Sequence, residues 1–180
     1  VDELVQTITH MAPSFGGINL EDISAPRCFE IERRLRETLD IPVFHDDQHG
    51  TAIVVGAALI NALRVVGKHM EDINVVINGA GSAGVAISDM LLKLGVTNLV
   101  VCDINGCLLP TDTTLNPYQL QLAKETNPQH IHGTLSEALR DADVFIGVSA
   151  GNIVTHKMIA SMAQDAIVFA LANPTPEVSR

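Results

Sequence analysis

The sequence predicts an α/β fold, a doubly wound parallel sheet with helices on both faces, preceded by part of a neighbouring domain. From residue 74 onward, short apolar segments alternate with segments of helical periodicity, which is the pattern of consecutive β-α-β units. A glycine-rich turn joins the first of these strands to the first helix. Because the chain before this point lacks the alternation, we expect two parts, residues 1–68 and residues 69–180.

The expected strands are short and rich in β-branched residues, as buried parallel strands are. They are Asn74–Asn78, Asn98–Asp103, Asp143–Val148 and Ala166–Ala172, with a short edge strand at His130–Ile131. The expected helices are Ala83–Leu94, Pro117–Thr126, Thr134–Arg140 and Thr155–Met162. We expect Gly95 to follow the end of the first helix, and Thr134 or Ser136 to cap the third.

The first third of the chain is organised differently. Cys28–Leu39 predicts a charged amphipathic helix, and Pro42–His45 predicts a short strand. Thr51–Val66 is almost wholly apolar, but its 16 residues are fewer than a membrane span needs. We therefore expect a buried helix between two layers. The sequence starts in mid-pattern and ends just after a strand, which suggests a piece of a longer protein.

Composition and charge exclude some classes of partner. With 11 Lys and Arg against 21 Asp and Glu, the formal net charge is −10, so the surface repels phosphate backbones and nucleic acid is not expected as a partner. The start of the chain lacks the pattern of a signal peptide, and no membrane partner is expected. The three cysteines show no CxxC spacing, which favours a cytoplasmic protein without a disulfide framework.

The glycine-rich turn has the spacing of a dinucleotide-binding site. It fits GxGxxG between a predicted strand and a predicted helix, and Asp103 lies nineteen residues beyond its last glycine. These features together indicate a Rossmann-like domain; the alternative is a loop that only turns the chain. In such a turn the helix N–H groups bind the pyrophosphate. The turn consists of Gly79, Ala80, Gly81, Ser82, Ala83 and Gly84.

Asp103 bears on the choice between NAD and NADP. At the end of the second strand its carboxylate would accept hydrogen bonds from the adenosine ribose hydroxyls. The same charge repels a 2′-phosphate, and no Lys or Arg follows it in INGCLLP. NAD is therefore favoured as the cofactor, with NADP as the alternative.

Two acidic pairs, Glu21-Asp22 and Asp46-Asp47, lie beside glycine-containing turns. Carboxylate oxygens suit Mg²⁺ or Mn²⁺ better than zinc, and crowded carboxylates are costly unless a cation neutralises them. The alternative for each pair is a solvated loop or a helix cap, with Asp47 capping the helix near Thr51. A zinc site at His45 and His49 would need both on one helical face, and Gly50 and the strand-like VFH argue against a helix there.

The motifs FGGINLEDISAP, FHDDQHGTA, INGAGSAG and FALANPTPE, in this order, resemble those of the malic enzymes, especially the shorter bacterial type. The resemblance implies NAD(P)-dependent oxidative decarboxylation of L-malate to pyruvate and CO₂ by a homo-oligomeric parent enzyme. It implies metal ligands at Glu21, Asp22 and Asp47, with Asp46 beside the active site, where it helps set the charge of a catalytic Lys. It also implies that Asn173 reaches the substrate or the nicotinamide ribose. The loop with Ser149 and, less strongly, Asn152 would lie at the nicotinamide side.

The sequence departs from this family in one respect. The family carries its general acid, a Tyr, and its general base, a Lys, in a region before GGINLED. The fourteen residues before Phe15 contain neither, and Tyr118 and the four lysines do not match these positions. The 180 residues are therefore expected to bind dinucleotide and metal but to turn over malate poorly or not at all. Two alternatives stay open: another Rossmann oxidoreductase, such as an amino-acid or methylene-tetrahydrofolate dehydrogenase, and a non-catalytic NAD-sensing module.

Overall fold

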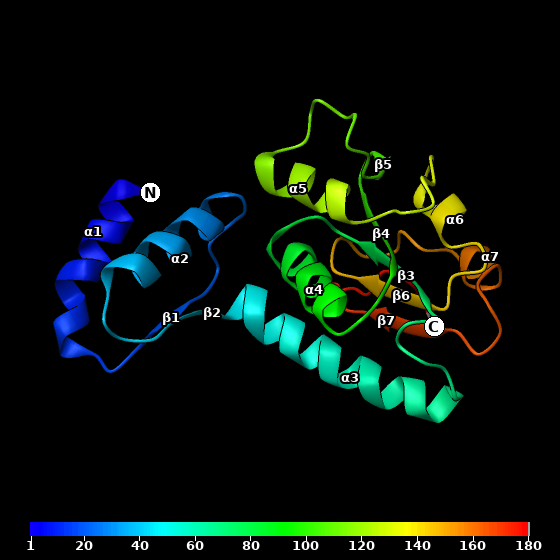
Figure 1. The fold of residues 1–180 in the computed structure, drawn as a ribbon, viewed down its shortest axis with the longest axis horizontal. Helices are drawn as coiled ribbons and strands as arrows, with labels where there is room; N and C mark the ends of the chain where they lie inside the picture. Colours follow the sequence, from blue (N-terminus) through cyan, green and yellow to red (C-terminus); the bar gives the residue numbers. More distant parts are fainter. Residues whose placement is uncertain (180) are drawn as a thin grey trace.

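The structure, a computed structural model, describes residues 1–179. A small N-terminal unit lies beside a larger unit built on a five-stranded sheet, and helix α3 (Thr51–Val66) runs from one to the other (Figure 1). The strand order is β5-β4-β3-β6-β7, with β5 antiparallel and the other four parallel. The strands are β3 (Asn74–Asn78), β4 (Asn98–Asp103), β5 (Gly106–Cys107), β6 (Val144–Gly147) and β7 (Ile167–Ala170).

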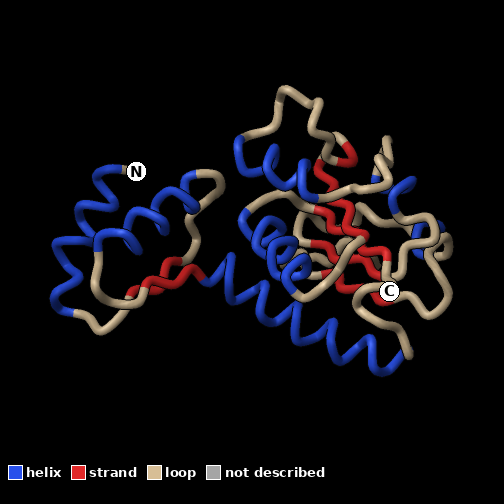
Figure 2. Tube along the Cα trace, viewed as in Figure 1, coloured by secondary structure: helices blue, strands red, loops and turns tan. Residues whose placement is uncertain are grey.

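Each face of this sheet has its own apolar core, because successive residues of a strand point to opposite faces. Val75 and Ile77 of β3 pack with residues of α3, α4 and α5. Val76 and Phe145 pack on the other face with residues of α6 and α7. The predicted doubly wound sheet is therefore confirmed (Figure 2). The helices are α3 (Thr51–Val66), α4 (Ser82–Lys93), α5 (Pro117–Glu125), α6 (Leu135–Ala138) and α7 (His156–Ile159).

Local signals fix several of the helix ends. Gly95 has a φ of +102° and directly follows the C-cap of α4, Leu94, as expected of a glycine that ends a helix. Thr134, rather than Ser136, caps α6, and Glu137 completes a capping box with it. The predictions of these two ends are confirmed.

The predicted edge strand at His130–Ile131 is wrong. The side chain of Asn127 accepts a hydrogen bond from the Ile131 N–H at 2.7 Å and donates one to the Ile131 carbonyl at 2.9 Å. One amide side chain thus satisfies the backbone groups that a neighbouring strand would have satisfied. The sheet ends instead at β5, whose two residues pair with β4.

The N-terminal unit has a separate small core formed by Val5, Leu20, Ile31 and Leu35. The helix and strand expected from the sequence in this region are present, with slightly shifted ends. A first helix, and a strand that pairs in parallel with Val43–His45, were not predicted. The elements are α1 (Asp2–Met11), the 3₁₀ turn η1 (Ala12–Ser14), β1 (Ile18–Leu20), α2 (Arg27–Thr38) and β2 (Val43–His45).

Helix α3 is extended at its start by a π-helical turn, η2 (Asp46–Gly50). Gly50 and the strand-like VFH argued against a helix at this place, and that expectation is wrong. The continuous helical run has 21 residues and is long and apolar enough to cross a membrane by length and composition, a test that a core helix also passes. Ala52, Val55 and Leu59 pack into the core of the sheet, whereas Val54 is 67% exposed.

Candidate functional site

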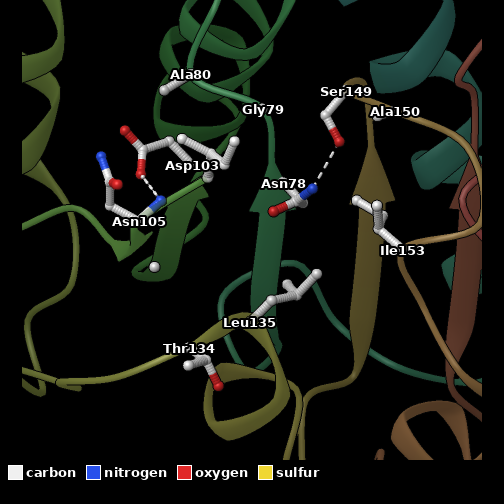
Figure 3. Close-up of a pocket in the computed structure, with 12 residues that line it drawn as sticks. Asn78, Gly79, Ala80, Asp103, Asn105, Thr134, Leu135, Ser149, Ala150 and Ile153 are labelled. Carbon is white, nitrogen blue, oxygen red and sulfur yellow. Dashed lines mark hydrogen bonds between the residues drawn. The ribbon is translucent and has the colours of Figure 1, made fainter.

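A cleft of about 500 Å³ opens at the carboxyl ends of β3, β4 and β6 (Figure 3). The strand that follows β3 in sequence, β4, lies on one side of it, and β6 lies on the other. The cleft is therefore at the topological switch point, where doubly wound sheets bind ligands. Its lining includes Asn78, Gly79, Asp103, Thr134, Ser149 and Ile153.

The structure explains the three glycines of the turn in different ways. Gly79 has a φ of +122°, and a Cβ there would lie 2.7 Å from the carbonyl oxygen of Val148. A Cβ on Gly84 would overlap the Gly79 carbonyl oxygen, so both glycines are required by the chain itself. A Cβ on Gly81 would meet no protein atom within 4 Å, and the φ of Gly81 is −89°. The protein therefore leaves open space at Gly81, where the predicted pyrophosphate would approach.

The start of α4 has donors available for a ligand. Gly81 is its N-cap residue and makes no side-chain cap hydrogen bond, so the first N–H groups of the helix keep their capacity to bind an anion. Ser82 and Ala83 are the first two residues of the helix, and Ala80 lines the cleft. Of the predicted turn, Gly79 and Ala80 line the cleft, and the residues from Gly81 onward lead into α4.

Asp103 ends β4 and lines the cleft, as the ribose prediction requires. Its Oδ1 accepts a hydrogen bond of 2.7 Å from the backbone N–H of Asn105, which fixes the carboxylate at the mouth of the loop (Figure 3). Ile104, the residue between them, is 98% exposed. Sequence reasoning singled out only Asp103 in this segment.

The opposite wall joins the ends of β3 and β6. The Asn78 side-chain amide donates a hydrogen bond of 2.6 Å to the Ser149 hydroxyl (Figure 3). Ser149 and Ala150 both line the cleft, so the loop that was predicted to lie at the nicotinamide side does reach the cleft. Asn78 was not predicted, although a polar residue that ends an apolar strand was a usable signal.

The loops that follow β6 and β7 are tied together. The Asn152 N–H donates to the carbonyl of Pro176 at 2.9 Å, and Asn152 itself has a φ of +60°. Asn173, predicted to reach the substrate or ribose, is exposed in the second loop and is not among the residues that line the cleft. Glu177 in the same loop is fully buried, which nothing in the sequence indicated.

The structure brings one member of each predicted acidic pair together, Asp22 and Asp47. The backbone N–H of Asp22 donates to Asp47 Oδ2 at 2.9 Å, because the parallel pairing of β1 and β2 brings the segments after Leu20 and His45 side by side. Glu21 does not join them: residues 1–179 contain no group of three or more His, Cys, Asp or Glu side chains placed to hold a metal ion. Mg²⁺ prefers six oxygen ligands, so these residues do not form a complete metal site as arranged.

Asp47 does not cap α3, because that helix continues directly from η2 and has no side-chain cap. The alternative in which Asp47 caps this helix is therefore wrong. Asp46, the predicted residue beside the active site, is half-buried with its carboxylate against Gly50. The turn η2 packs against α4. The acidic cluster, by which we mean Asp22, Asp46 and Asp47, therefore lies beside the helix that begins at the glycine turn.

The two histidines around this cluster have different surroundings. His45 is fully buried, and neither ring nitrogen has a hydrogen-bond partner among the described residues. The His49 Nε2 lies 2.5 Å from Oε1 of Glu32, a buried carboxylate of α2. These surroundings do not form a shared zinc site.

No Lys or Tyr is found among the cleft-lining residues of the part that the structure describes. The ring of Tyr118 contacts the ring of Phe29, with 4.2 Å between centroids. Lys68 donates to the Asp143 carboxylate at 2.8 Å and to the Gln164 carbonyl at 2.6 Å. Both side chains thus have structural contacts outside the cleft.

Comparison with known proteins agrees with this arrangement. Residues 48–179 match the family model "malic enzyme, NAD binding domain", and residues 1–36 match "malic enzyme, N-terminal domain". The chain is 55% identical over 177 residues to the NAD-dependent malic enzyme of Geobacillus stearothermophilus, which covers 98% of this chain and 37% of that protein. It is 48% identical over 181 residues to the NADP-dependent malic enzyme of Haemophilus influenzae, covering 99% of this chain and 24% of that protein.

A solved structure is similar over nearly the whole chain. The crystal structure of the NAD-dependent malic enzyme from Thermotoga maritima has a TM-score of 0.96 and 50% identity, covering 99% of this chain and 48% of that one. The chain therefore spans less than half the length of each of these relatives. Because the NAD-binding family model covers most of the sequence, and the cleft lies at the switch point where doubly wound sheets bind ligands, the chain belongs to the malic enzyme family.

Proposed function

We propose that this chain supplies the dinucleotide-binding part of an enzyme that converts L-malate to pyruvate and CO₂, with NAD as the preferred cofactor. The observation that carries the proposal is the geometry of the glycine turn at the switch-point cleft. Gly79 and Gly84 are required by close backbone contacts, whereas Gly81 faces open space. A turn that only reverses the chain would not need a glycine at position 81.

In the proposed complex, the N–H groups at the start of α4 bind the pyrophosphate. Asp103 accepts hydrogen bonds from the adenosine ribose and disfavours a 2′-phosphate. The nicotinamide end would lie towards Ser149, since Asp103 and Ser149 line opposite sides of the cleft. Asn173 would reach the substrate or the nicotinamide ribose, from the loop after β7.

We also propose that Glu21, Asp22 and Asp47 take part in binding Mg²⁺ or Mn²⁺, with Asp46 beside them. The hydrogen bond between Asp22 and Asp47 and the hard oxygen donors support this. Since two adjacent acidic residues are too few for the cation, further ligands are needed.

The 180 residues alone are proposed to turn over malate poorly or not at all. Oxidation of the hydroxyl needs a general base, and protonation of the enol product needs a general acid. The residues that line the described cleft include no Lys or Tyr to serve in these roles. Malate turnover by this chain at the rate of a full-length relative would contradict the proposal. The cytoplasmic location and the homo-oligomeric parent enzyme stay predictions.

Calorimetric titration of the chain with NAD and with NADP, each with and without Mn²⁺ plus malate, tests these proposals. Saturable NAD binding that tightens with Mn²⁺ and malate is the expected result. NAD binding that ignores both additions would favour a non-catalytic NAD-sensing module and count against the metal site. Absence of binding by either dinucleotide would overturn the assignment of the cleft.

A further inference from the structure

Glu177 is a buried acid that the proposed reaction does not use. Its side chain is fully buried, and it follows β7 by seven residues. A carboxylate removed from water is costly unless hydrogen bonds replace its hydration. Glu177 has such bonds: Oε1 accepts from the Ser149 N–H at 3.1 Å, and Oε2 accepts from the Ala172 N–H at 3.0 Å.

The two donors belong to the loops that follow β6 and β7, and the first of these loops lines the cleft. Ser149 lines the cleft and its hydroxyl accepts from Asn78. Ala172 directly precedes Asn173. One carboxylate therefore connects a cleft wall to the residue proposed to contact the ribose or substrate, and through Asn78 it is linked to the end of β3.

The surrounding backbone leaves little freedom for this carboxylate. The Glu177 carbonyl accepts from the Val154 N–H at 2.8 Å, a further hydrogen bond between the loops besides those of Ser149 and Asn152. A Cβ on Gly147, at the end of β6, would overlap the Glu177 carboxyl group, and a Cβ on Gly151 would lie 2.6 Å from the Thr175 carbonyl. Because Gly147 and Gly151 have no side chains, the loop after β7 can pack directly against the loop after β6, with Glu177 at the point of contact.

We propose that Glu177 is a positioning residue for the nicotinamide half of the dinucleotide. It acts through Ser149 and Ala172 and does not itself touch the ligand. Because an ionised carboxylate is an acceptor at both oxygens, it can hold two N–H groups at once. A glutamine has one acceptor oxygen, so its NH₂ group would face one of the two donors and release that loop. The inference rests on the proposed NAD function.

The test compares NAD with ADP, which carries the adenosine and diphosphate but no nicotinamide ribose. In the full chain, Glu177→Gln should weaken NAD binding by about tenfold, the loss expected from one hydrogen bond to a charged group. ADP affinity should be unchanged. The matched control is Glu125→Gln at the exposed end of α5, which should alter neither affinity.

Equal weakening of NAD and ADP, or no weakening of either, would overturn the inference and leave Glu177 a structural residue. If Glu177→Gln does not fold, amide hydrogen exchange on the unaltered chain decides. Hydrogen exchange of the Ser149 and Ala172 amides should then become slower on addition of NAD but not of ADP. Exchange rates that do not change on addition of NAD would overturn the inference. If the unaltered chain binds neither ligand, the proposed function itself fails, and this inference fails with it.

Discussion

Cys102 and Cys107 lie directly opposite each other on β4 and β5, and their sulfur atoms are 3.7 Å apart. The Cys102 thiol donates to Cys107, and this bond lowers the pKa of Cys107. The same bond, together with burial, raises the pKa of Cys102. The two thiols of one short hairpin thus differ in acidity because they share one hydrogen bond.

Cys107 is therefore expected to be the first of the three cysteines to react with iodoacetamide near neutral pH, because the thiolate is the nucleophile. Cys102→Ala should remove the donated hydrogen bond, raise the pKa of Cys107 and slow its alkylation at pH 7 more than at pH 9. Mass spectrometry of timed samples measures this. Cys28, whose pKa is raised by burial, is the internal control. Faster alkylation of Cys102 than of Cys107 would contradict the assignment.

The glycine turn allows a paired test. Gly81→Ala should change the free energy of unfolding by about 1 kcal/mol at most, the difference between N-cap residues, yet weaken NAD binding by about tenfold or more. Gly84→Ala should cost about 3 kcal/mol or more, because the added Cβ would overlap the Gly79 carbonyl. Chemical denaturation and NAD titration of both variants measure these effects. NAD binding unaffected in a folded Gly81→Ala variant would contradict the proposed approach of the pyrophosphate.

Asp103→Asn should narrow the preference for NAD over NADP. The amide keeps an acceptor oxygen for the Asn105 N–H but removes the charge that repels a 2′-phosphate. NAD affinity is expected to fall by about tenfold, since hydrogen bonds to a charged group are lost, while NADP affinity should stay equal or rise. Calorimetry with both dinucleotides measures the ratio. If the ratio does not change, the discrimination does not lie at Asp103.

The sheet could be predicted from the sequence because its signals are local. Buried parallel strands are short β-branched runs bounded by turns, and β3 and β4 have the limits predicted from such runs. The glycine turn could be predicted because its backbone contacts restrict residue types at fixed spacing. The strand β5 has only two residues and no such signal. The segment at His130–Ile131 resembled an edge strand, but the Asn127 side chain forms the hydrogen bonds of its backbone.

The parts of the site that were missed depend on contacts between distant segments. Asn78 meets Ser149 across 71 residues, and Glu177 meets Ser149 across 28. No periodicity or motif in one sequence encodes such pairings. Conversely, the family resemblance grouped Glu21 with Asp22 and Asp47, and the described structure shows a hydrogen bond only between Asp22 and Asp47.

Lys68 connects the end of α3 to the amino-terminal edge of the sheet. It donates to Asp143, whose other oxygen accepts from the Asn74 N–H at 2.8 Å. Both side chains of this pair are mostly buried, with 21% and 16% exposed. Lys68→Met should lower the free energy of unfolding by about 1–2 kcal/mol, since a partly buried charged hydrogen bond is lost. Urea denaturation measures it, with Lys93→Met in the exposed pair with Asp89 as control, expected to cost about 0.5 kcal/mol or less.

The substitution Asp47→Asn distinguishes two roles of Asp47, that of a metal ligand and that of a hydrogen-bond acceptor within the protein. The asparagine oxygen can still accept the Asp22 N–H, so the free energy of unfolding should change by about 0.5 kcal/mol or less. A lost carboxylate, however, should weaken Mn²⁺ binding by about tenfold or more, because hard cations depend on charged oxygen ligands. Electron paramagnetic resonance of free Mn²⁺ measures the affinity.

Asp112→Asn is the matched control for this metal test, because Asp112 lies in a turn away from the acidic cluster and bonds Thr114. It should leave Mn²⁺ affinity unchanged. Equal Mn²⁺ affinity of the Asp47→Asn variant and the unaltered chain would remove Asp47 from the proposed ligand set. If the unaltered chain binds no Mn²⁺ while it binds NAD, the acidic side chains of this chain are insufficient for the cation, in line with the lack of any group of three possible ligands within residues 1–179. The dinucleotide cleft would then be independent of the cation, and the tightening of NAD binding by Mn²⁺ and malate should be absent as well.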